Sequence, residues 1–312
     1  MSQKEPSLMT HRRKTVLRAV GFFVAMLLVV MPVFTVILYH EAFGGRLETD
    51  ERMAYAVRAF PGLQMTECSF PSNHGQMLAG YRYSRGEKRA DKGLVVLAHG
   101  IGGGQNAYMN VANYFTSQGF LVFAYDATGT DKSEGASMEG LPQGVIDLDY
   151  ALRYVKQCAE YQDLPIALFG HSWGGYCVGN VLNYHPDVRA AVLVAGFDRS
   201  TDLIEQQGET MIGFAIHLFM PYLSLYERLR FGEYAAFSVM DGFAASDAGV
   251  MVVHSRDDRT VLPENGFDRF FDVYGEDPRF SFVEYEDRGH NKLLDSVLME
   301  QIVDFYLSYC CG

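Results

Sequence analysis

A chain of 312 residues that is 48% hydrophobic can bury the core of one large domain. Its formal net charge of −12 argues against nucleic acid as a partner, because phosphate binding depends on clustered Lys and Arg. The charge is uneven: residues 1–39 hold five basic residues and one acidic residue, so the remainder has a net charge of −16. The basic start therefore differs in kind from the acidic body.

The first apolar run, residues 16–39, contains a single charged residue, Arg18. About 20 apolar residues span a bilayer core. This run is longer than the apolar region of a signal peptide, and no clear cleavage site follows it. It predicts an uncleaved membrane anchor; the alternative is a signal peptide that is removed to give a secreted protein. The positive-inside tendency favours a cytoplasmic tail at residues 1–15 and a body outside the cytoplasm.

Residues 40–63 are expected to form a helical linker, and strands then alternate with helices. Strands are expected at residues 64–70, 76–83, 94–98, 120–125, 164–169, 190–195, 249–253 and 280–285, and helices at 108–117, 144–159, 176–184 and 293–309. The first two strands suggest a β-hairpin. Strands such as 94–98 are apolar on both faces, as a parallel sheet demands. The pattern predicts an α/β fold over residues 64–312, with a doubly wound, mostly parallel sheet.

Residues 197–247 interrupt this alternation with a segment longer than a crossover needs. The insertion is rich in Met, Phe and Tyr, and two to four helices are expected in it. It is either extra core over a sheet edge or a cap whose apolar face forms a substrate pocket. Phe214 and Phe219 are the candidate pocket residues.

Residues 170–175, Gly-His-Ser-Trp-Gly-Gly, lie between an expected strand and an expected helix. Gly-x-Ser-x-Gly at such a junction is the nucleophile-elbow pattern, although the letters alone occur by chance in many proteins. In this tight turn, side chains at Gly170 and Gly174 would collide with neighbouring backbone. The turn presents Ser172 at a helix N-terminus, where the dipole favours negative charge. Ser172 is therefore the candidate nucleophile.

A serine nucleophile needs a base, and the base needs an orienting acid. On this type of sheet both partners follow later strands. His290 lies in a Gly-His loop after the last expected strand, and His254 is the rival base. Asp257 and Asp258 follow the preceding strand as candidate acids.

Together these residues resemble the α/β-hydrolase fold family from about residue 64 onward. The matching motifs are His-Gly-Ile-Gly-Gly at 99–103, the motif at 170–175, Asp-Asp-Arg-Thr-Val at 257–261, and Gly-His at 289–290. The resemblance implies that Ser172 is the nucleophile, Asp258 the acid and His290 the base. It also implies an oxyanion hole made by the backbone N–H groups of Ile101 and Trp173.

Residues 126–133 are similar to a loop of lysophospholipase-like and serine-aminopeptidase-like members of this family. Thr130 and Asp131 depart from that loop's usual pattern. Ser255, at a position that is usually Gly, is a second departure.

The expected chemistry passes through an acyl-enzyme and needs neither a metal nor an organic cofactor. The first expectation is a carboxylic ester hydrolase, esterase- or lysophospholipase-like, acting on a small acyl ester or lipid near a membrane. The alternative is a serine peptidase, aminopeptidase- or prolyl-oligopeptidase-like. It would need acidic residues to bind a substrate amine, and the insertion offers Asp198, Asp202, Glu205 and Glu209. A non-catalytic binder is the third class, and the sequence does not indicate an oligomeric state.

Overall fold

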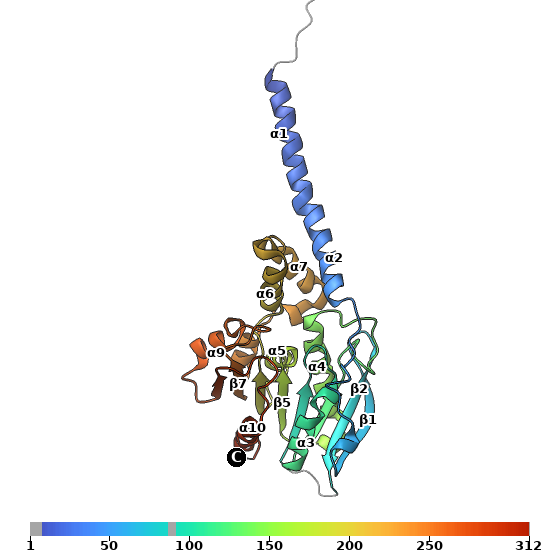
Figure 1. The fold of residues 1–312 in the computed structure, drawn as a ribbon. Helices are drawn as coiled ribbons and strands as arrows, with labels where there is room; N and C mark the ends of the chain where they lie inside the picture. Colours follow the sequence, from blue (N-terminus) through green and yellow to red (C-terminus); the bar gives the residue numbers. More distant parts are fainter. Residues whose placement is uncertain (1–7, 87–91, 312) are drawn as a thin grey trace, which may run out of the picture.

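The computed structural model describes residues 8–86 and 92–311, and its centre is one eight-stranded sheet (Figure 1). The strands are β1 Leu63–Pro71, β2 Met77–Arg85, β3 Leu94–Ala98, β4 Leu121–Tyr125, β5 Ile166–His171, β6 Ala190–Val194, β7 Gly249–Ser255 and β8 Phe280–Tyr285. Their order is β1-β2-β4-β3-β5-β6-β7-β8. The β1–β2 hairpin and the β2–β4 pair are antiparallel, and all other pairs are parallel. The expected mostly parallel α/β sheet is confirmed.

Helices cover both faces of this sheet. Those that pack on it are α3 Met109–Ser117, α4 Leu141–Gln157, α5 Trp173–Val181, α9 Phe267–Tyr274 and α10 Ser296–Cys310. Residues of α4, α5 and α9 share one buried cluster with alternate strand residues such as Val96. Residues of α3 and α10 share the other, with strand residues such as Val95. The central strands are therefore buried on both faces, as their apolar sequence demands.

The strand register brings the candidate loops to one edge. Ala98 at the end of β3 pairs with Gly170 near the end of β5, so the 99–103 loop and Ser172 begin at the same level. Ser255 at the end of β7 pairs with Tyr285 at the end of β8. The loops carrying Asp258 and His290 therefore leave the sheet side by side.

The N-terminal segment is one long helix that rises from this edge (Figure 1). It consists of α1 Leu8–Ala25, a π-helical turn Met26–Val30 and α2 Met31–Phe43. The π turn lies next to Pro32, which has no N–H to donate and cannot continue the regular ladder. The stretch Arg12–Phe43 is long and apolar enough to cross a membrane, and its most apolar 18-residue window has a mean hydropathy of 2.7. Residues 1–7 of the expected basic tail lie outside the described residues.

The expected helical linker is wrong for most of its length. The helix ends at Phe43, where Gly44 caps the His40 carbonyl, and only a short 3₁₀ turn at Val57–Ala59 follows before β1. The intervening chain lies on the body instead, through a bridge between Leu47 and Thr130. Local sequence favoured a helix, but contacts with a distant loop decide its path.

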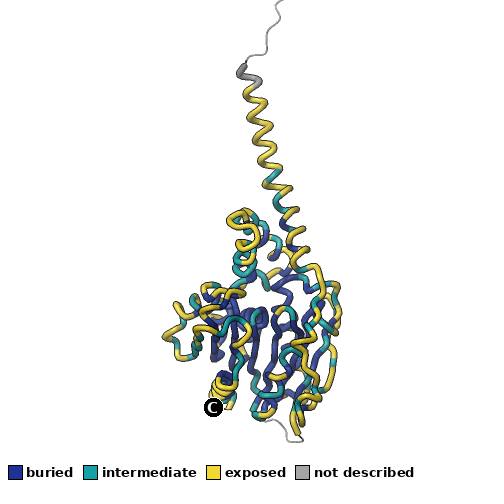
Figure 2. The backbone as a smooth tube through the Cα atoms, viewed as in Figure 1, coloured by how far each residue is buried: buried dark blue, intermediate teal, exposed yellow. Residues whose placement is uncertain are grey.

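The insertion after β6 forms a helical cap at the end of the molecule from which the N-terminal helix rises (Figure 1). It contains α6 Ser200–Ile212, α7 Met220–Phe231 and α8 Val239–Ala245, joined by 3₁₀ turns at Gly213–Leu218 and Gly232–Ala235. Figure 2 shows the contrast in burial: the sheet is largely buried, whereas the cap tip and most of the N-terminal helix are exposed. These helices lie within residues 197–247.

Candidate active site

Ser172 occupies a strained turn between β5 and α5. Its backbone has φ 57° and ψ −119°, a conformation that residues with a side chain rarely adopt. A side chain at Gly170 would overlap the backbone of Gly174, and one at Gly174 would overlap the carbonyl of Ala98. Glycines are therefore required at both positions, for the steric reason given by the sequence pattern.

The loop after β3 lies against this serine. A methyl group at Gly100 would touch the Ser172 Cβ at 3.4 Å. The next residue in the loop is Ile101, and Trp173 is the first residue of α5, where backbone N–H groups have no partner within the helix. Of the two positions expected to form an oxyanion hole, Trp173 thus directly follows Ser172, and Ile101 follows Gly100, which lies against the serine.

Buried His99 fixes the start of that loop. Its Nε2 accepts a hydrogen bond from the Ala127 N–H at 3.0 Å, so its Nδ1 carries the proton and donates to the Gly100 carbonyl at 2.9 Å. Burial lowers the pKa of His99, so the ring is neutral and keeps this arrangement at neutral pH.

His290 is paired with Asp258. The distance from His290 Nδ1 to Asp258 Oδ2 is 2.7 Å, and the other carboxylate oxygen accepts from the N–H groups of Thr260 and Val261. Burial alone would raise the pKa of Asp258. The hydrogen bonds and the charge of His290 outweigh burial and hold that pKa below its ordinary value. An ionised Asp258 is suited to orient the imidazole and to stabilise its protonated form.

His254, the rival base, is buried beneath the acid loop. Its Nε2 bonds the Val261 carbonyl at 3.0 Å and lies 3.4 Å from Asp258 Oδ2. Burial lowers its pKa. His254 therefore supports the turn that carries Asp258.

Ser255, at a position that is usually Gly in the resembling family, has a structural role that the sequence did not predict. The Ser255 hydroxyl donates to Asp257 Oδ1 at 2.6 Å and accepts from the Arg288 N–H at 2.9 Å. Asp257 Oδ1 also accepts from the Gly289 N–H at 2.7 Å. Ser255 and Asp257 thus fasten the acid loop to the His290 loop. The partners are more than thirty residues apart, so no local pattern signals them.

His171 was also assigned no role from the sequence. Its Nδ1 accepts from the Tyr108 hydroxyl at 2.8 Å, and its Nε2–H donates to the His290 carbonyl at 2.9 Å. The same hydroxyl accepts from the Gly100 N–H at 3.1 Å. Burial, with a further contribution from nearby His290, lowers the pKa of His171 to about 4, so the ring is neutral. It links the loop after β3 to the backbone of His290.

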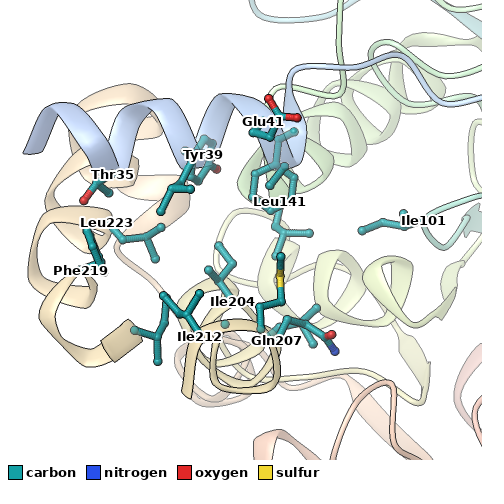
Figure 3. Close-up of a pocket in the computed structure, with 17 residues that line it drawn as sticks. Thr35, Tyr39, Glu41, Ile101, Leu141, Ile204, Gln207, Ile212, Phe219 and Leu223 are labelled. Atoms are coloured by element: carbon teal, nitrogen blue, oxygen red, sulfur yellow. The ribbon is translucent and has the colours of Figure 1, made fainter. Parts of the chain in front are cut away.

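An apolar cavity of about 500 Å³ lies between the cap, the N-terminal helix and this edge (Figure 3). Phe219 lines it, and so does Ile101 at the side of the sheet edge. Phe214 does not: it is 81% exposed, and its ring packs on His217. The 3₁₀ turn that follows α6 carries Phe214 to the outside of the cap.

The acidic residues considered for binding a substrate amine have other partners. The Asp198 carboxylate accepts from the Met240 N–H, Asp202 pairs with Arg269, and Glu205 and Glu209 both contact His217. Glu41 is the only carboxylate among the described residues that line the cavity.

Comparisons with known proteins agree with this architecture. The family model described as serine aminopeptidase matches residues 89–233. Monoglyceride lipase of Mus musculus is 36% identical over 89 residues, which are 27% of this chain and 28% of that protein. Monoacylglycerol lipase of Mycolicibacterium smegmatis is 30% identical over 105 residues, 34% of this chain and 38% of that protein. The sequence matches thus span well under half of each relative.

Solved structures extend the likeness over most of the chain. An esterase of Pyrococcus furiosus has a TM-score of 0.65 at 13% identity, covering 85% of this chain and 98% of that one. A dipeptidyl aminopeptidase IV-like chain of Bacteroides ovatus has a TM-score of 0.60 at 14% identity, covering 79% of this chain and 36% of that one. At these identities the likeness concerns the fold. Together with the sheet order and the strained serine turn, it shows that the chain has the α/β-hydrolase fold.

Proposed function

We propose that the protein is a serine hydrolase that cleaves carboxylic esters through Ser172, His290 and Asp258. The observation that carries the proposal is the His290–Asp258 pair at the sheet edge where Ser172 sits in its strained turn. A nucleophile, a base and an oriented acid at one edge are what acyl transfer requires. The lipase and esterase relatives support an ester as substrate.

The reaction proceeds in two halves. Ser172 Oγ attacks the substrate carbonyl while His290 Nε2 takes its proton, and Asp258 stabilises the imidazolium that results. The tetrahedral oxyanion accepts hydrogen bonds from the Ile101 and Trp173 N–H groups, and loss of one such donor typically costs about 10²–10³ in rate. His290 protonates the leaving alcohol, which departs. Water then attacks the acyl-enzyme with His290 as base, which releases the acid and regenerates Ser172.

The apolar cavity favours an acyl ester over a peptide. An acyl chain buried there gains about 0.8 kcal/mol per methylene. A charged substrate amine would need an unengaged carboxylate. The four candidate acidic residues of the insertion are already paired, which leaves Glu41 of the N-terminal helix as the one carboxylate among the described lining residues. Aminopeptidase activity is the second candidate because of the family model that matches residues 89–233.

A substrate panel separates the two candidates. The full chain is assayed in detergent on p-nitrophenyl acetate, butyrate and laurate, and on alanyl, leucyl and prolyl anilides, with Ser172→Ala as the matched control in each arm. We expect ester hydrolysis that rises with chain length and is lost in the control. Serine-dependent cleavage of the anilides without ester cleavage would instead favour the peptidase.

We also propose that the N-terminal helix is an uncleaved single-pass anchor, with residues 1–15 in the cytoplasm and the body outside. Its length and hydropathy and the basic residues before it support this topology. The full chain should remain with membranes after a carbonate wash, and protease added outside spheroplasts should digest the body. A soluble product that starts near residue 42 would contradict the anchor and indicate a cleaved signal peptide.

A further inference from the structure

The C-terminal end of the N-terminal helix is packed against the cap. The Tyr39 hydroxyl donates to Glu227 of α7 at 3.0 Å, and the other oxygen of that buried carboxylate accepts from Ser200 of α6 at 2.6 Å. The Tyr39 ring lies 5.0 Å from that of Tyr226. The rings of Phe34 and Phe219 are 5.8 Å apart. The helix therefore has a defined position relative to the cap.

The chain after the helix is equally well held. Arg46 donates to the backbone carbonyls of Asp131, Ser133 and Gly135. The Thr49 hydroxyl donates to the Asp131 carboxylate at 2.6 Å and accepts from the Gly104 N–H at 2.6 Å. The unusual Asp131 of the 126–133 loop is thus a docking point for this segment, which cannot act as a loose tether.

The helix also forms one wall of the apolar cavity (Figure 3). Its contribution comes from the last turns of α2, and the opposite wall comes from α6, the 3₁₀ turn and α7. Helix residues that line the cavity are Thr35, Leu38, Tyr39, Glu41, Ala42 and Phe43. Without α2 the cavity would lack this side and be an open groove on the cap.

Helix length places this wall just outside a bilayer. Residues 16–35, at 1.5 Å per residue, cover roughly 30 Å, the thickness of the hydrocarbon core. The lining residues from Thr35 onward then begin where the core ends. At the same end of the molecule the cap exposes apolar side chains, among them Met211, Phe214 and Leu218. Such an apolar tip suits contact with the membrane interface.

We infer that the N-terminal helix is a structural part of the acyl-binding site, and that the cavity receives the single acyl chain of a lipid ester directly from the adjacent membrane. This inference rests on the proposed ester hydrolysis at Ser172. The chain lies between α2 and the cap, with its ester group toward Ile101 and the reacting serine.

A tethered photoprobe tests where the chain lies. The probe is a dodecyl fluorophosphonate with a diazirine at the end of the alkyl tail, applied to the full chain in membranes. Ser172 Oγ displaces fluoride from phosphorus and its proton passes to His290, which fixes the probe head. Irradiation expels N₂ from the diazirine, and the resulting carbene inserts into whatever the tail touches. We expect cross-links in residues 19–46, the tryptic peptide between Arg18 and Arg46.

A butyl version of the probe is the matched control, because its diazirine stays much nearer the phosphorus than that of the dodecyl probe, so cross-links to residues 19–46 should be fewer. Cross-links of the dodecyl tail confined to cap peptides, with Ser172 phosphonylated, would overturn the role of the helix and leave the proposed function intact. Absence of phosphonylation at Ser172 would instead overturn the proposed function.

A pair of variants gives an independent kinetic measurement. Ala42→Trp fills the cavity from the helix side, whereas Ile37→Trp changes an exposed position of the same helix that does not line it. Overfilling of this kind should lower kcat/KM for the laurate ester by about tenfold or more. Acetate hydrolysis should fall much less than laurate hydrolysis in Ala42→Trp, since a short acyl group needs little of the cavity. Equal kinetics for the two variants on laurate would overturn the inference.

Discussion

The sheet edge around Ser172 differs from the cap and its N-terminal helix in how far its side chains are buried and held by hydrogen bonds. At the sheet edge, His99, His171 and Asp258 are buried, and each has hydrogen-bond partners on separate loops. The cap and helix present side chains that are largely exposed, such as Met211 at 82% and Leu229 at 78%. The first region suits chemistry, which needs fixed atoms, and the second suits selection of an apolar ligand.

The largest effect should follow from removing the proposed nucleophile, Ser172, at the sheet edge. Ser172→Ala should abolish both ester hydrolysis and labelling by a fluorophosphonate, because in the proposed mechanism the attack comes from the Ser172 hydroxyl. The thermal midpoint should change little, since alanine keeps the backbone strain and loses one hydroxyl. Labelling measured by intact mass checks this, and retained labelling of the variant would move the nucleophile elsewhere.

The two adjacent aspartates at the sheet edge should differ in their effect on the reaction. Asp258→Asn keeps the shape but loses the negative charge beside His290, and kcat should fall by about 10⁴, as for an equivalent change in a serine protease. Asp257→Asn keeps an oxygen that can accept from Gly289, so its loss should be below about tenfold.

Steady-state kinetics of both variants on one short ester provides the measurement. The reverse ranking would assign the orienting role to Asp257. Equal and modest losses would indicate that another carboxylate supports His290.

Two phenylalanines of the cap should likewise differ in their effect on ester hydrolysis. Phe219→Asp puts a charge into the cavity wall and should lower kcat/KM for laurate by about 10- to 100-fold, with acetate far less affected. Phe214→Asp lies outside the cavity and should change laurate hydrolysis in detergent by less than about threefold. Chain-length profiles of the two variants decide the matter, and equal losses on acetate and laurate would indicate a folding defect.

The smallest effect concerns Glu227, at the contact between the cap and the N-terminal helix. Burial raises the pKa of Glu227 from 4.5 to about 7, against the opposing hydrogen bonds from Ser200 and Tyr39. The folded protein therefore binds this proton more tightly than the unfolded chain does. The resulting stabilisation is complete below pH about 4.5 and is lost as pH rises through about 7.

Glu227→Gln has no such proton, so the difference in thermal midpoint between wild type and variant should depend on pH across this window. The wild type should lose a few degrees relative to the variant between pH 5 and pH 8. A constant difference would mean that Glu227 is ionised throughout, and that the contact is insensitive to pH.

Strands were predictable where the physics is local. Residues 94–98 are apolar on both faces and end in a glycine loop, and β3 has those bounds. By contrast, α9 was missed because it is short and amphipathic, a pattern that also occurs in surface turns. The linker was mistaken for a helix because its path depends on Leu47 and Thr49 meeting residues about 80 positions away.

The candidate site also has parts that were predictable from local sequence and parts that were not. Ser172 and His290 stand in short motifs whose glycines have steric reasons that a sequence carries. The fastening of Asp257 to Gly289 and the bond from His171 to the His290 carbonyl join distant segments. The contribution of the N-terminal helix to the cavity wall could not be predicted, because no pattern in residues 16–39 indicates that this helix packs against the cap.

The hydroxyl of Thr49 limits how far the chain can be truncated from its N-terminus. A shortened protein that begins at residue 64, where the alternating pattern starts, would leave the buried Gly104 N–H without its acceptor and the Asp131 carboxylate without Thr49. An orphaned buried donor typically costs about 1–3 kcal/mol. A shortened version of the chain should therefore retain at least residues 46–63.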